Sequence, residues 1–140
     1  YGLAMRLHTD PSLRMLRETA EADALRLASA GRNERFDYAA TIAARWSRER
    51  AAVLDTLDAW RWWWRARLLE ASRGEPGPVR CTPAEAVRAL QAVTTTREHL
   101  LANTNPQLAL EVMMLDLPVL AAPPEDPREE TREAVAPAQP

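Results

Sequence analysis

The chain has 140 residues, with 18 basic and 20 acidic side chains and a formal net charge of −2. This near balance gives no overall attraction to nucleic acid or to a membrane surface. The four glycines form no phosphate-binding loop, and β-branched residues are too scarce for a buried parallel sheet. Abundant alanine, leucine, arginine and glutamate instead favour helices, and the length suits one domain. The composition therefore predicts an all-α protein rather than an α/β nucleotide-binding fold.

Targeting and redox signals are sparse. The single cysteine, Cys81, has no partner for an internal disulfide and no metal-site spacing, which predicts a reducing, cytoplasmic setting. No apolar run approaches the roughly 18 residues that cross a bilayer, so no membrane association is expected. Residues 1–8 do not resemble a signal peptide. Because the chain begins at Tyr1 rather than Met, we expect an excised domain or a fragment.

The first two predicted helices follow each other closely. Asp10 and Pro11 supply an N-cap and a proline at the first helical position, and apolar residues then recur at helical spacing up to Gly31, which is expected to end this helix. Asn33 is the expected cap of a second helix, whose apolar positions continue to Trp46. Both segments therefore read as amphipathic helices.

The next two helices flank the clearest loop. Ser47 either caps a third helix or marks a bend, and an apolar stripe then runs along residues 53–71. Residues 72–78 combine glycine and proline and predict a loop. Thr82 and Glu85 have the spacing of a capping box with proline at the first helical position, which predicts the start of a fourth helix.

A fifth helix is predicted from Asn105-Pro106 to Leu117, where Pro118 stops it. It is apolar nearly all round, so we expect it to be enclosed on several sides, partly by another subunit. Core packing explains its apolar residues equally well. The candidate contact positions on this helix are Leu108, Val112, Met113 and Leu115.

Residues 118–140 differ in composition from the rest. They hold six of the eleven prolines, and their five acids against two arginines give a net charge of −3. Such a segment buries too little apolar area to offset the entropy of ordering it. A flexible, acidic tail is therefore expected.

Four tryptophans lie within five positions of the third helix. Trp60 and Trp64 continue its apolar stripe, whereas Trp62 and Trp63 must point elsewhere because successive residues are about 100° apart. Packing within a helical array explains them best. A protein interface that uses Trp62, Trp63 and Arg65 is the second interpretation, and base stacking with single-stranded nucleic acid is the third.

Residues that could carry chemistry are few. His8 and His99 lack partners at ligand spacing, and Cys81 precedes a helix but lacks a convincing base. The sequence therefore predicts no catalytic, cofactor-binding or metal-binding residue. Arg97 falls near the apolar stripe of the fourth helix, where it either extends to water or pairs with an acid of a neighbouring helix or subunit.

Three segments together suggest a family. Residues 96–111 read TREHLLANTNPQLALE, residues 63–69 read WWRARLL, and residues 2–7 read GLAMRL ahead of Asp10-Pro11. In this order they resemble the C-terminal part of bacterial clamp-loader subunits, chiefly the delta-prime and less closely the gamma/tau subunit of DNA polymerase III. Ala66 stands where that family has an acid, so any ion pair made by the acid is not expected here.

The resemblance implies a five- or six-helix bundle of the collar type, which joins clamp-loader subunits into a pentamer. Residues 1–9 would end a lid domain, residues 10–117 would form the collar domain, and residues 118–140 would be the tail. The expected partners are the gamma/tau and delta subunits, with indirect association with DNA and the sliding clamp. The family's nucleotide site lies upstream of this region, so the resemblance implies neither catalysis nor a cofactor here.

Two other functions stay open at this point. One is a stand-alone α-helical adaptor that binds an unrelated protein, and the other is a helical nucleic-acid-binding module. The genomic sequence upstream of Tyr1 separates the adaptor from the clamp-loader interpretation, because only a clamp-loader subunit has an ATPase module there. The second is distinguished by salt-dependent DNA binding.

Overall fold

A computed structural model of the chain describes residues 11–121, and these form five α-helices without a strand. The predicted all-α class is thus confirmed. The predicted lid remnant at residues 1–9 and most of the predicted tail, residues 122–140, lie outside the described residues. The helices are α2 (Pro11–Ala28), α3 (Arg32–Trp46), α4 (Arg50–Arg73), α5 (Pro83–Leu101) and α6 (Pro106–Asp116).

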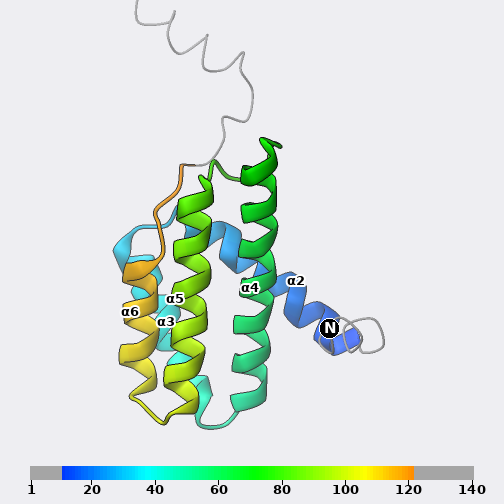
Figure 1. The fold of residues 1–140 in the computed structure, drawn as a ribbon. Helices are drawn as coiled ribbons and strands as arrows, with labels where there is room; N and C mark the ends of the chain where they lie inside the picture. Colours follow the sequence, from blue (N-terminus) through cyan, green and yellow to red (C-terminus); the bar gives the residue numbers. More distant parts are fainter. Residues whose placement is uncertain (1–10, 122–140) are drawn as a thin grey trace, which may run out of the picture.

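The helices pack in two levels. In Figure 1, α4, α5 and α6 run side by side, with α5 in the middle, while α3 and α2 lie behind them. α3 packs mainly on α6, and α2 crosses α4. The core between these levels is rich in alanine, tryptophan and leucine. Its largest fully buried side chains are Trp60, Trp64, Leu27, Leu100, Leu110, Met113, Met114, Val53 and Val93.

Two helix starts follow directly from local sequence. The Thr82 hydroxyl accepts the Glu85 N–H at 3.1 Å, and the Glu85 carboxylate accepts the Thr82 N–H at 3.0 Å. The side-chain oxygen of Asn105 accepts the Leu108 N–H at 3.1 Å. Each pairing satisfies backbone donors that have no partner within the first helical turn. The predicted starts of α5 and α6 are therefore confirmed.

The predicted cap at Asn33 is wrong, whereas the bend that the sequence offered as the alternative at Ser47 is confirmed. Asn33 lies within α3, whose N-cap is Gly31 in an extended conformation, and the preceding helix already ends at Ala28. Glycine is itself a favourable N-cap, so α3 begins earlier than expected. Ser47 keeps a helical backbone (φ −68°, ψ −26°) and ends α3, while Glu49 is the N-cap of α4.

The chain after α6 packs back on the bundle. Pro118 and Leu120, placed in the flexible tail by the sequence, are buried, and the Leu120 N–H donates to the Ala28 carbonyl at 2.8 Å. The Ala121 carbonyl accepts the Arg80 N–H at 3.4 Å. The structure differs here from the sequence-based expectation, because Leu120 provides an apolar anchor that composition averaged over residues 118–140 conceals.

Candidate functional site

Helix α6 is apolar on two opposite faces. One faces the core and is buried, and the other lies on the outer surface of the domain. The buried face comprises Ala109, Leu110, Met113 and Met114. The opposite face, called here the α6 outer face, comprises Leu108, Val112 and Leu115, with 59%, 42% and 54% of each residue exposed.

The four candidate contacts on this helix therefore separate. Spacings of four and three residues bring Leu108, Val112 and Leu115 onto one side of the helix, where they are free to contact a partner. Met113 is only 1% exposed and belongs to the core, so the core-packing interpretation holds for it and it offers no surface. Within residues 11–121, α6 packs on α3 and α5, and its outer face is left exposed. Coverage of that face by another subunit, the other part of the expectation, stays a prediction.

The tryptophans of α4 also divide into buried and exposed. Trp60 stacks on Tyr38 with ring centroids 5.5 Å apart, and Trp63 meets Trp64 edge to face at 4.9 Å. These three tryptophans lie in the core, as the packing interpretation predicts. Trp63 is consequently not a surface contact residue. Trp62, which is 44% exposed, is the member of the cluster that a partner can reach.

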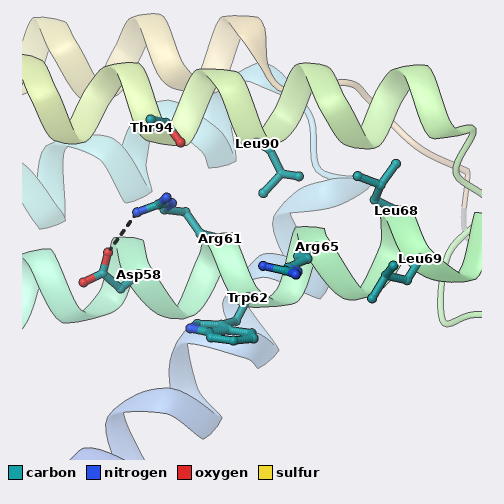
Figure 2. A pocket seen from close by; sticks show the side chains of 8 residues that line it. All are labelled: Asp58, Arg61, Trp62, Arg65, Leu68, Leu69, Leu90 and Thr94. Atoms are coloured by element: carbon teal, nitrogen blue, oxygen red, sulfur yellow. Dashed lines mark ion pairs between the residues drawn. The ribbon is translucent and has the colours of Figure 1, made fainter. Parts of the chain in front are cut away.

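Trp62 lies in a groove along the outer surface of α4 and α5, called here the α4–α5 groove. Figure 2 shows Arg61 and Arg65 between α4 and α5, with Leu90 and Thr94 on α5, while Trp62 projects from α4 on the side away from α5 and forms the rim of the groove. The guanidinium of Arg65 lies 5.7 Å from the Trp62 ring centroid, within cation–π range. The cavity has a volume of about 710 Å³. Its lining residues are Asp58, Arg61, Trp62, Arg65, Leu68, Leu69, Leu90 and Thr94.

Arg97 pairs with an acid of a neighbouring helix, one of the alternatives drawn from the sequence. Its Nε donates to the Asp58 carboxylate of α4 at 3.1 Å. Asp58 is also 3.7 Å from the Arg61 guanidinium, so one carboxylate serves two arginines at the edge of the groove. Because both partners are partly exposed, the pair contributes little to stability.

Arg35, which the sequence interpretation overlooked, lies where the end of α2 meets the end of α6. Arg35 is 4% exposed, and its guanidinium donates to five backbone carbonyls at 2.8–3.2 Å, an arrangement called here the Arg35 junction. Burial lowers the pKa of Arg35, yet an arginine stays protonated in proteins. The acceptors belong to Leu27, Ala28, Met114, Leu117 and Pro118.

A weak signal for Arg35 exists in the sequence. Arg35, Ala39, Ile42 and Trp46 repeat at spacings of four, three and four, and all four are buried. Periodicity therefore places Arg35 on the core face of α3. This position is easily assigned to the surface instead, because arginine is rarely fully buried without a partner.

The titratable groups offer no assembled reaction centre in the described part of the chain. The Cys81 thiol lies against the Thr82 carbonyl at 3.3 Å, and burial raises its pKa, which disfavours the reactive thiolate. Burial, followed by the nearby Asp23 carboxylate, likewise raises the pKa of Tyr38. No group of three or more metal-ligating side chains occurs in residues 11–121. His99 is exposed on α5, and His8 lies outside the described residues.

None of the helices described has both the length and the apolar character needed to cross a membrane. Comparisons of the chain with protein-family models, with curated proteins and with solved structures gave no match.

Proposed function

We propose that this chain is a protein-assembly domain, the collar domain of a bacterial clamp-loader subunit of the delta-prime type. In that role it would bind the C-terminal domains of gamma/tau and delta subunits in a hetero-pentamer that places the sliding clamp on primed DNA. The domain itself would supply contacts rather than catalysis, and its association with DNA and clamp would be indirect. A cytoplasmic location follows from the same proposal.

The observation that carries the proposal is the α6 outer face. Leu108, Val112 and Leu115 form an aliphatic surface on the last helix, while the opposite side of α6 already supplies the core. An exposed, contiguous apolar surface is typical of protein–protein contact sites. Leu101, at the end of α5, is also about half exposed and immediately precedes the turn into α6.

The local structure of residues 96–111 supports the resemblance on which the specific assignment rests. Asn103 adopts a left-handed backbone conformation (φ 60°) in the turn between α5 and α6, and asparagine tolerates that region better than most residues. Asn105 then caps α6, and Pro106 occupies its first position. Both asparagines of the family-like run thus have a conformational role in a helical hairpin.

Co-purification tests this proposal. The chain is expressed with affinity-tagged gamma and delta subunits from the same organism, and we expect it to elute with them in one complex. A chain that is folded by circular dichroism but is captured by no loader subunit would overturn the assignment. An α-helical adaptor for an unrelated protein would then be the better account of the same exposed surfaces, and the genomic sequence upstream of Tyr1 would lack an ATPase module.

A further inference from the structure

The α4–α5 groove carries positive charge that the described chain only partly neutralises. Arg61 is 3.7 Å from Asp58, but the same carboxylate also accepts from Arg97 at 3.1 Å. Arg65 lies over Trp62, and no carboxylate within residues 11–121 forms an ion pair with it. The groove therefore combines an exposed indole with guanidinium groups that can donate hydrogen bonds to further carboxylates.

The described chain ends at the same end of the bundle as one end of this groove. The Ala121 carbonyl accepts the N–H of Arg80, which lies between the end of α4 and the start of α5. In Figure 1 the last described residues, drawn in orange, reach the end of the helical layer where α4 ends and α5 begins. Leu69 lines the groove one turn before the end of α4. The described chain thus ends at this end of the bundle, and nineteen further residues, 122–140, follow in the sequence.

These residues are long enough to follow the groove and have complementary charge. The helical rise places Arg61 about 12 Å from Leu69 along α4, and an extended chain spans roughly 3.3–3.6 Å per residue. Within residues 122–140 there are five acids against two arginines, a net charge of −3. The acids begin four residues after Ala121. They are Glu125, Asp126, Glu129, Glu130 and Glu133.

We propose that the acidic segment 125–133 of this chain docks in its own α4–α5 groove, with carboxylates on Arg61 and Arg65 and part of the chain over Trp62. Tethering raises the local concentration of the segment to the order of millimolar, so a contact with a dissociation constant near 1 mM occupies about half of the molecules. The docked segment would cover Trp62 and Arg65, two residues that the sequence marks as partner contacts. The proposal does not depend on the clamp-loader assignment.

Quenching of tryptophan fluorescence by acrylamide measures directly whether the segment covers Trp62. Trp62 is exposed, whereas the other four tryptophans, Trp46, Trp60, Trp63 and Trp64, are each at most 7% exposed. Acrylamide carries no charge, so the arginines do not attract it, and the exposed indole dominates the response. The experiment uses the whole chain at low protein concentration and compares two tail variants.

In the first variant all five acids are neutralised: Glu125→Gln, Asp126→Asn, Glu129→Gln, Glu130→Gln and Glu133→Gln. The matched control keeps every charge by exchanging the same residues, Glu→Asp and Asp→Glu. If about half of the molecules are docked, neutralisation raises the Stern–Volmer constant of Trp62 about twofold, while the control keeps the wild-type value. Arg61→Gln, which leaves Arg65 over Trp62, shifts the constant in the same direction, and roughly 0.5 M NaCl gives the full rise because salt screens exposed charges.

Three results would overturn the proposal. The first is equal quenching in the neutralised and charge-keeping variants, which means that the segment does not cover Trp62. The second is protection that grows with protein concentration, which places the segment on another copy of the chain. The third is quenching of Trp62 by an oligothymidine to the same extent in both variants, which assigns the groove to nucleic acid. None of the three involves a loader subunit, so they are independent of the loader-binding test.

Discussion

The Arg35 junction and the outer surface of the domain use their side chains in opposite ways. At the junction a charged residue is buried, and every hydrogen bond that it makes goes to a backbone carbonyl of α2 or of the chain around the end of α6. On the outer surface, the apolar residues of α6 and Trp62 of α4 stay exposed. This contrast indicates that the junction holds the fold together, whereas the outer surface is available for binding.

The largest effect is expected at the junction itself. Replacing Arg35 with Met keeps most of the volume but removes the donor to the carbonyls of Met114, Leu117 and Pro118. The two α2 carbonyls each keep a backbone N–H donor. Each buried unsatisfied group costs about 1–3 kcal/mol, and some regain water, so we expect a loss of about 3–5 kcal/mol in the free energy of unfolding. Urea denaturation measures it. The exposed neighbour Arg32→Met is the matched control, and equal stability of the two variants would contradict this role for Arg35.

The segment after α6 gives the next largest effect. Leu120 is 4% exposed while Val119 is 70% exposed, so adjacent positions provide a matched pair. We expect Leu120→Ala to lower the free energy of unfolding by about 2 kcal/mol or more, because it leaves a cavity. Val119→Ala should change it by less than about 0.5 kcal/mol. Equal, small effects in thermal and urea denaturation would mean that residues 118–121 do not belong to the folded unit.

The cap of α5 contributes less, because it stabilises one helix end at the surface. Thr82→Ala removes the acceptor for the Glu85 N–H and should cost about 1 kcal/mol. Thr95→Ala, an exposed position in the middle of the same helix, should be neutral or slightly stabilising because alanine has the higher helix propensity. If both variants unfold at the same urea concentration, the capping box does not contribute as described.

Local sequence signals were sufficient for most of the fold. Thr82 and Asn105 cap α5 and α6 through hydrogen bonds to residues three positions later. These two helix starts can therefore be predicted without knowing how the helices pack. The Arg35 junction could not be predicted in this way, because three of its five acceptors lie about 80 residues further along the chain. The periodicity of α3 predicts that Arg35 lies on the core face, but it does not predict which backbone carbonyls Arg35 binds.

The candidate site was predicted in outline only. Helical geometry shows that Trp60 to Trp64 cannot share one face, but which of them stays exposed depends on how α2 and α5 pack against α4. For α6 both faces are apolar, so the sequence alone does not distinguish Met113, which is buried, from Leu108, which is exposed. Orientation of a uniformly apolar helix is decided by its neighbours and not by its own pattern.

The central claim, that the outer surface binds a partner and does not hold the fold, is tested most directly on α6. The variant carries Leu108→Gln, Val112→Gln and Leu115→Gln, and its control carries Met15→Gln and Leu25→Gln at exposed apolar positions of α2. Gln is a good helix former, so both proteins should unfold within about 1 kcal/mol of the original chain.

The measurement is the dissociation constant of each protein for the gamma and delta subunits, by calorimetry or by surface-immobilised binding. We predict that the α6 variant binds at least about tenfold more weakly, equivalent to about 1.4 kcal/mol, while the α2 control binds like the original chain. Unchanged binding by a folded α6 variant would contradict the account.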